Sequence, residues 1–333
     1  SCPAELTPGG PRPARGQAYQ GVPGAYSEQA VLASHPGAEP LPCPTFGKAF
    51  RAVSEGRAER AVLPIENSLG GSIHATYDLL LGYPLHVVGE GAIPVRHCLL
   101  ALPGTALGDL ERALSHPQAL AQTADFIRGL PGKGGLGVAM EAVDDTAGAA
   151  QAVADERLEG AAAVASSRAA ELYGLDVLAE DIQDNKLNFT RFIHLAREPH
   201  PPTPDGGAPG GAGAGGGAER LKTSVVFGLR EGPGELFKAL SAFALREIDL
   251  TKIESRPLGG GGQGGEEGGP GALAAGGQDT LLSPQGGFTV LFYVDFEGSL
   301  SDKNVQNALR HLQEISTFLR VLGSYPFDAG LGQ

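Results

Sequence analysis

Residues 17–198 alternate between short apolar segments, which fit strands, and segments whose apolar positions have helical spacing. The predicted strands are 60–65, 112–115, 136–142 and 161–165, and the predicted helices are 28–34, 46–55, 73–81, 117–128, 146–155 and 167–173. Strands that alternate with helices are typical of α/β domains. We therefore predict an α/β fold for this part of the chain.

One apolar stretch, residues 85–102, is too long for an ordinary strand and is broken at Pro94. It fits a segment that leaves one sheet and enters another, and the chain returns through residues 176–190. Two such crossings predict a two-lobed, periplasmic-binding-protein-like clamp with its ligand between the lobes. The predicted lobe 1 comprises 17–93 and 182–198, and the predicted lobe 2 comprises 94–181.

The C-terminal part, residues 219–327, has a different order of elements. The predicted strand, helix, two strands, helix and strand are 222–230, 234–246, 249–257, 288–296, 302–316 and 318–325. This βαββαβ order is the ferredoxin-like α+β plan. Segments rich in Gly and Pro predict a disordered leader at 1–16, a flexible linker at 199–218 and a disordered insert at 259–287.

Composition and charge limit the classes of function. The chain has 333 residues, 41% of them hydrophobic, and a formal net charge of −13. It is long enough for two or three domains, and its charge disfavours binding to nucleic acid or to an anionic membrane surface. The widely spaced Cys2, Cys43 and Cys98 predict a reducing compartment, with neither a disulfide framework nor a metal site. We expect a soluble protein, because the chain has no long uncharged apolar run.

The segment Asn188–Phe192, where a predicted strand begins, contains polar side chains that could take part in catalysis. A threonine hydroxyl contributes to catalysis only when it is oriented toward a developing charge in a water-poor site, and a strand would hold Thr190 in that way. Arg191 offers a permanent planar cation for a carboxylate. The alternative is an ordinary edge strand with an exposed arginine.

Two turns add hydrogen-bond donors. The turn at 21–27 leads into a predicted helix and directs backbone N–H groups and the Ser27 hydroxyl toward one point. The predicted strand 60–65 is followed by Asn67, Ser68, Gly70 and Gly71, at the kind of strand end where α/β sheets bind ligands. Each turn alone is equally consistent with a simple turn or helix cap.

Four segments closely resemble the prephenate and arogenate dehydratases, particularly those of plants and algae. They are Tyr19–Ser27, Pro64–Ser72, Ser115–Leu120 and Asn188–Phe192. Residues 222–326 resemble the ACT regulatory domain of that family. One departure is Phe189, where the family has a small β-branched residue; on a strand its side chain should point away from Thr190, so we expect a change in packing and intact chemistry.

The resemblance implies a cofactor-free, metal-free decarboxylation coupled to loss of the ring hydroxyl. It identifies Thr190 as the catalytic donor that helps the hydroxyl to leave. The expected substrate-binding residues are Ser27, Asn67, Ser68, Gly70, Gly71, Gln118, Arg191 and Phe192. Arg191 is assigned to a substrate carboxylate; alternatively, it braces the strand by pairing with an acidic residue. The expected phenylalanine site of the ACT domain comprises Gly234, Glu235, Leu236, Glu254, Ser255 and Arg256.

The resemblance favours arogenate, giving phenylalanine directly, over prephenate, giving phenylpyruvate. It also implies a homodimer or homotetramer, feedback regulation by phenylalanine, and the chloroplast stroma, with a transit peptide absent from this sequence. Because no long helical stretch precedes residue 17, we expect no chorismate mutase domain there. A hypothesis of a different class is a non-catalytic solute-binding or amino-acid-sensing protein, because hinged clamps and ACT domains also occur in such proteins.

Overall fold

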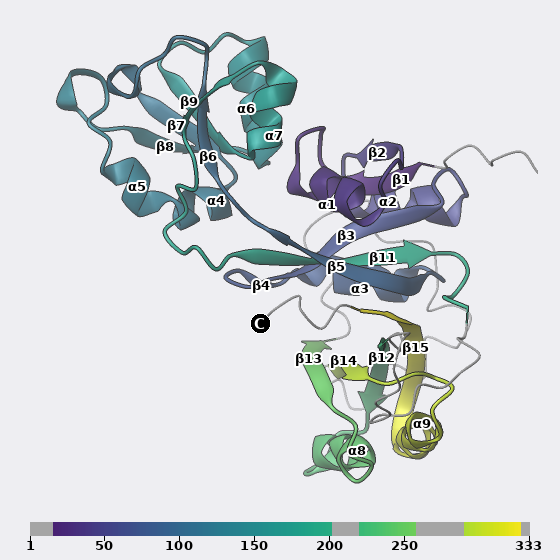
Figure 1. Cartoon of the computed structure of the whole chain (residues 1–333). Coiled ribbons are helices and arrows are strands. Elements are labelled where there is room, and N and C mark those ends of the chain that lie inside the picture. The colour runs from purple at the N-terminus through teal and green to yellow at the C-terminus, as the bar shows by residue number, and fades with distance from the viewer. Residues whose placement is uncertain (1–15, 202–219, 258–289, 328–333) are drawn as a thin grey trace, which may run out of the picture.

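The computed structural model describes residues 16–201, 220–257 and 290–327. Apart from Gly16 and residues 199–201, the predicted leader, linker and insert lie outside these ranges. The described residues form three separate sheets, each accompanied by helices (Figure 1). The fold is therefore a two-lobed α/β clamp of the periplasmic-binding-protein type followed by a ferredoxin-like domain. No helix in the described ranges combines the length and the apolar character needed to span a membrane.

The first sheet, in lobe 1, has the strand order β2-β1-β3-β11-β5, with β4 paired to β3. Its strands are β1 (Gln17–Gln20), β2 (Pro40–Cys43), β3 (Arg60–Asn67), β4 (Gly71–Ser72), β5 (His86–Pro94) and β11 (Phe189–Ala196), and its helices are α1 (Tyr26–Ser34), α2 (Phe46–Ser54) and α3 (His74–Gly82). Strand β11 is antiparallel to both β3 and β5. The last strand of the clamp is thus inserted between two strands that lie about a hundred residues earlier in the sequence.

The second sheet, in lobe 2, has the order β10-β6-β9-β7-β8. Its elements are β6 (Cys98–Ala101), η1 (Leu107–Asp109), β7 (Arg112–Ser115), α4 (Pro117–Gln122), α5 (Ala124–Arg128), η2 (Lys133–Gly135), β8 (Ala139–Ala142), α6 (Thr146–Asp155), β9 (Ala161–Ala165), α7 (Ser167–Tyr173) and β10 (Asp176–Ala179). The prediction of a single helix at 117–128 is wrong, because the structure has two helices there, α4 and α5. The helical segment is interrupted at Thr123, whose backbone is not helical (φ −124°, ψ 14°) and whose hydroxyl donates to the carbonyl of Ala119.

The third sheet has the order β13-β14-β12-β15, as the ferredoxin-like plan requires. Its elements are β12 (Leu221–Leu229), α8 (Glu235–Ala244), β13 (Leu250–Pro257), β14 (Val290–Glu297), α9 (Lys303–Ile315) and β15 (Ser316–Pro326). Both helices cover the face of the sheet that points away from lobe 1 (Figure 1). The opposite face packs directly on lobe 1.

This contact between the third sheet and lobe 1 is a continuous hydrophobic core. Val226, Tyr293 and Leu322 of the third sheet belong to the same buried cluster as Leu63 of β3 and Leu195 of β11. The strands approach so closely that a Cβ atom on Gly323 would lie 2.0 Å from the carbonyl oxygen of Val87. The third sheet therefore packs against the strands that carry the candidate site and stabilises them.

Candidate functional site

Thr190 lies on β11 directly opposite Asn67 of β3, because the two residues are register partners in the sheet. Both are buried. The Asn67 amide nitrogen Nδ2 donates to the Thr190 hydroxyl oxygen at 3.0 Å, while Asn67 Oδ1 accepts from the backbone N–H groups of Leu69 (3.0 Å) and Gly70 (2.8 Å). The turn after β3 therefore fixes the amide that orients the threonine.

The hydrogen bonds continue from Asn67 into lobe 2. Asn67 Nδ2 also contacts Asn188 Oδ1 at 2.8 Å, and Asn188 Nδ2 donates to Gln122 Oε1 at 3.0 Å. Gln122 Oε1 lies 3.1 Å from Nε2 of His97, and Nδ1 of His97 lies 3.2 Å from the Tyr26 hydroxyl. We call this series, Thr190–Asn67–Asn188–Gln122–His97–Tyr26, the interlobe chain; it joins α1 and β3 of lobe 1 to α4 of lobe 2.

Burial sets the protonation state at the far end of the interlobe chain. Desolvation lowers the pKa of His97, although its hydrogen bond to Gln122 acts in the opposite direction. Desolvation also raises the pKa of Tyr26 well above its ordinary value, and the nearby Cys98 and Asp181 add to the effect. At neutral pH the interlobe chain is thus composed of uncharged groups.

The two lobes touch at Gly70 and Gln118. A Cβ atom on Gly70 would lie only 1.8 Å from the Gln118 amide nitrogen. The neighbouring Gly71 has a φ of +77°, in the left-handed region that favours glycine. The structure therefore brings three of the predicted substrate-binding residues, Asn67, Gly70 and Gln118, together with Thr190.

Ser68 is also close to Thr190, but its hydroxyl is bonded to the backbone. It donates to the carbonyl of Leu187 (3.2 Å) and accepts from the N–H of Phe189 (3.0 Å). These bonds fix the turn after β3 against the segment that precedes Thr190. Ser27 is buried in the first turn of α1, one residue after the Tyr26 that ends the interlobe chain.

Two other predicted substrate contacts lie elsewhere. Phe192 is 1% exposed and packs with Tyr19, Val31 and Val62 in the core beneath α1. Its burial favours a packing role over the predicted substrate contact. Arg191 points to the opposite face of β11 from Thr190, because successive side chains alternate along a strand.

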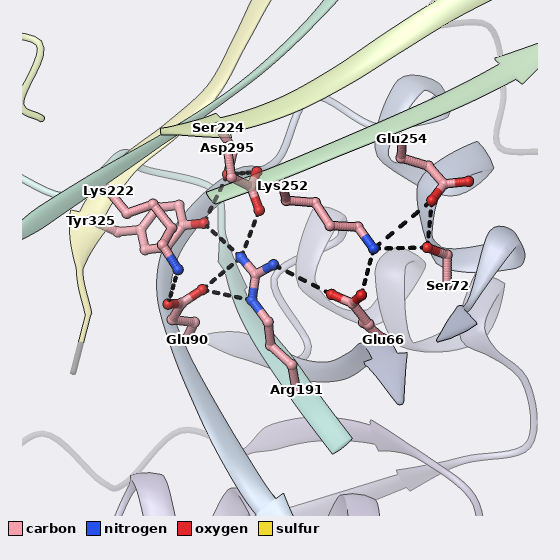
Figure 2. Close-up of polar contacts among 10 residues, drawn as sticks. All are labelled: Glu66, Ser72, Glu90, Arg191, Lys222, Ser224, Lys252, Glu254, Asp295 and Tyr325. Carbon is pink, nitrogen blue, oxygen red and sulfur yellow. Dashed lines mark hydrogen bonds and ion pairs between the residues drawn. The ribbon is translucent and has the colours of Figure 1, made fainter. Parts of the chain in front are cut away.

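Figure 2 shows the surroundings of Arg191. Its guanidinium contacts Glu90 of β5 (2.6 Å) and Asp295 of β14 (2.7 Å), and Glu90 is also paired with Lys222 of β12 (2.5 Å). Arg191 thus connects lobe 1 to the ferredoxin-like domain. This arrangement matches the alternative interpretation, in which the arginine braces the strand by pairing with an acidic residue, and it leaves Arg191 outside the residues grouped around Thr190.

The predicted effector residues on β13 are divided between its two faces. Glu254 accepts from the Ser72 hydroxyl of lobe 1 (2.5 Å), and Arg256 pairs with Asp78 of α3 (2.7 Å). Ser255, between them, is exposed and points to the other face. Only Ser255 of the three is therefore on the helix face of the sheet.

The remaining effector residues lie at the start of α8. Gly234 caps this helix in the left-handed conformation (φ +81°), and Glu235 and Leu236 follow in its first turn. Glu254 and Arg256 are thus not grouped with them.

Four residues of the interlobe chain, Asn188, Gln122, His97 and Tyr26, were missed by the sequence analysis as site residues, and Tyr26 lies next to the predicted Ser27. Asn188 lies inside the segment that was singled out, two residues before Thr190. Gln122 lies four residues after Gln118, and this spacing would place both on one helix face, so the helical period was a usable signal. His97 carries no such signal, because its place depends on where the two crossings meet.

The residues around Thr190 are separate from the pocket near Arg197, and they do not form a metal centre. In the described ranges, no three His, Cys, Asp or Glu side chains are grouped so that they could hold a metal ion. A pocket of about 330 Å³ lies at the far end of β11 from Thr190, next to Ala196 and Arg197. The candidate site is therefore the group of neutral donors and acceptors around Thr190.

Comparisons with known proteins show which family the chain resembles. Residues 17–200 match the family model described as prephenate dehydratase. The chain is 54% identical to arogenate dehydratase/prephenate dehydratase 2, chloroplastic, of Arabidopsis thaliana, over 93% of this chain and 72% of that one. It is 53% identical to arogenate dehydratase 2 of Petunia hybrida, over 94% and 72% of the two chains.

A solved structure extends the likeness to the whole fold. The prephenate dehydratase of Arthrobacter aurescens in complex with L-Phe is 32% identical to this chain. The two superpose with a TM-score of 0.72, covering 94% of this chain and 90% of the other.

Proposed function

The chain belongs to the prephenate dehydratase family, and we propose that its reaction is the decarboxylating dehydration of arogenate to L-phenylalanine. The plant relatives named arogenate dehydratase, at 53% and 54% identity, support arogenate as the substrate. Prephenate is the alternative, because the name of the Arabidopsis relative includes it. The enzyme is accordingly a carbon–oxygen lyase of phenylalanine biosynthesis.

The observation that carries the mechanism is the hydrogen bond from Asn67 to the Thr190 hydroxyl. An amide N–H occupies a lone pair of Oγ1, so the hydroxyl's own hydrogen is directed away from Asn67 and is available to the substrate. The bond between the ring and its carboxylate breaks, and its electron pair enters the ring. The bond from the ring to the hydroxyl breaks in turn, and Thr190 donates to the departing oxygen. The products are carbon dioxide, an aromatic ring and a hydroxide ion, which becomes water by taking up a proton from the solvent.

The substrate is held by neutral donors in this proposal. Gly70 and Gln118 face it from the two lobes, Asn67 orients the Thr190 hydroxyl toward it, and Ser27 with the N-terminus of α1 receives a carboxylate. Ser68 and Gly71 shape the turn that presents these groups. The ring's own gain in aromatic stabilisation drives the reaction, so Thr190 needs to act only as a well-placed hydrogen-bond donor.

Replacing Thr190 tests this mechanism against the sensor hypothesis. Thr190→Ala should lower kcat by a factor of about 10² to 10⁴, while the affinity for arogenate changes little. Thr190→Ser is the matched control, since it retains the hydroxyl and most of the activity. An alanine variant with unaltered turnover would exclude the catalytic role of Thr190. A wild-type protein that binds arogenate and prephenate without converting either would favour the non-catalytic class. Assays with arogenate and prephenate side by side decide which of the two is the substrate.

The ferredoxin-like domain is proposed to be an ACT domain that senses phenylalanine. The L-Phe complex of the related dehydratase supports phenylalanine as the effector. We place the effector at Gly234, Glu235 and Leu236 together with Ser255, whereas Glu254 and Arg256 bind lobe 1.

The remaining proposals concern location and organisation. The name of the Arabidopsis relative gives its location as chloroplastic, and we propose the chloroplast stroma for this chain. We also propose a homodimer or homotetramer. The predicted division into a catalytic domain at 17–198 and an ACT domain at 219–327 is retained as part of this proposal.

A further inference from the structure

His97 is buried at the place where the chain crosses between the two lobes. Its side chain is only 2% exposed. Its backbone N–H donates to Gln183 Oε1 and its carbonyl accepts from the N–H of Ile182, both at 2.9 Å. These two bonds tie the first crossing to the second, so His97 is held in a fixed position relative to both lobes.

The direction of the hydrogen bonds in the interlobe chain follows from two backbone groups. The N–H groups of Leu69 and Gly70 can only donate, so the Asn67 side-chain atom they contact must be the carbonyl oxygen. The other Asn67 side-chain atom, Nδ2, is therefore the donor, and its two hydrogens face Asn188 Oδ1 (2.8 Å), the Thr190 hydroxyl (3.0 Å) and the Phe189 carbonyl oxygen (3.1 Å). Asn188 accepts through Oδ1 and has only its Nδ2 left to turn toward lobe 2.

The same reasoning assigns the proton on His97. Asn188 Nδ2 donates to Gln122, so the Gln122 atom at this point is the acceptor Oε1. That oxygen also lies 3.1 Å from His97 Nε2, which must then carry a hydrogen. In neutral imidazole Nδ1 is then bare, and the Tyr26 hydroxyl shares its one hydrogen between the Arg96 carbonyl oxygen (2.6 Å) and Nδ1 (3.2 Å). The histidine is thus fixed as the Nε2–H tautomer.

We propose that His97 is a positioning residue for the dehydration, whose Nε2–H group holds the Gln122 amide and thereby keeps Asn188, Asn67 and the Thr190 hydroxyl aligned. This inference rests on the proposed function. Without the His97 donor the Gln122 amide is free to rotate by about 180°. Its NH₂ group would then face the NH₂ group of Asn188. That contact has two donors and no acceptor, so the interlobe chain breaks next to the catalytic threonine.

Two substitutions distinguish the proposed hydrogen-bonding role of His97 from an effect of its side-chain volume. His97→Leu removes the donor and should lower kcat by a factor of about 10 to 100 with KM within about threefold, because a small misplacement of catalytic groups acts mainly on the chemical step. His97→Gln places an amide N–H where Nε2–H stood, and its kcat should return to within about threefold of wild type. His311→Leu, on α9 of the ferredoxin-like domain, is the control and should leave kcat unaltered. If the glutamine variant is as slow as the leucine variant while both melt at the wild-type temperature, the proposal is wrong.

A measurement on the wild-type protein does not depend on either variant folding. A ¹⁵N NMR spectrum of the imidazole reports which ring nitrogen carries the hydrogen. Protonated Nε2 with bare Nδ1 supports the proposal, whereas the Nδ1–H tautomer overturns it. This result does not involve turnover. A failure of the proposed function would instead appear as a wild-type protein that converts neither arogenate nor prephenate.

Discussion

Replacing Arg191 by methionine distinguishes its two interpretations. The side chain of Arg191 is 20% exposed, and its partners Glu90 and Asp295 are 7% and 13% exposed. Methionine has a similar length but no charge, so Arg191→Met removes the cation and leaves the two carboxylates in place. Glu90 retains its pair with Lys222, whereas Asp295 retains the neutral Ser224 hydroxyl as a hydrogen-bond donor.

The magnitude follows from this environment. Breaking a buried ion pair by removing one partner costs about 3–5 kcal/mol, because an unpaired charge is left in a desolvated site. Since Lys222 still compensates Glu90, we expect the lower end of that range, about 3 kcal/mol. A second substitution, Asp295→Asn, removes the stranded charge and should recover part of the loss. Recovery of this kind identifies Asp295 as the source of the penalty.

Urea unfolding followed by circular dichroism measures the effect, since the chain has no tryptophan to report by fluorescence. The matched control is Arg112→Met, because Arg112 pairs with Glu141 at the surface, where the two side chains are 39% and 48% exposed. Such a pair contributes about 0–1 kcal/mol. If Arg191→Met is as stable as the control and its KM for arogenate rises about 10- to 100-fold, the carboxylate assignment is right and the bracing interpretation is wrong.

Three further predictions concern the interlobe contact, pH and regulation. Gly70→Ala should lower kcat/KM about tenfold, because the added methyl group displaces Gln118. The control is Gly108→Ala, since Gly108 has open space around it, and equal kcat/KM values for the two variants would contradict the contact between Gly70 and Gln118. Burial and His35 lower the pKa of His194 to about 3, so between pH 7 and pH 5 the unfolded chain binds a proton that the folded chain does not. The free energy of unfolding measured in urea should therefore fall by about 2 kcal/mol from pH 7 to pH 5, and by less in His194→Gln. Ser255→Phe should abolish the response of turnover to phenylalanine; a retained response would exclude Ser255.

Much of the fold could be predicted from local sequence patterns. Apolar alternation and helical spacing predicted most strands and helices of both lobes, together with the full βαββαβ order of the C-terminal domain. Strand β2 was missed because it contains Pro40 and Pro42, which weaken a strand signal and are tolerated at the edge of a sheet. The break at Thr123 was missed because it depends on a side-chain hydrogen bond within the helix.

The residues around Thr190 were only partly predictable, and Arg191 shows why. The alternation that turns Phe189 away from Thr190 applies equally to Arg191, so sequence alone could have placed Arg191 on the rear face. It could not have identified the partners of Arg191, because Glu90 and Asp295 are about one hundred residues away in opposite directions along the chain.

Strands β3 and β11 therefore serve two sites at once. On one face, the paired Asn67 and Thr190 form the proposed catalytic hydrogen bond. On the other face, the adjacent Glu66 accepts from Lys252 of the ferredoxin-like domain at 2.6 Å, and Arg191 pairs with Asp295 (Figure 2). A shift of the third sheet would act on Glu66 and Arg191, which are directly bonded along the backbone to Asn67 and Thr190. A ligand bound to the ferredoxin-like domain can alter turnover by this route only if it binds the two positions of the sheet with different affinity.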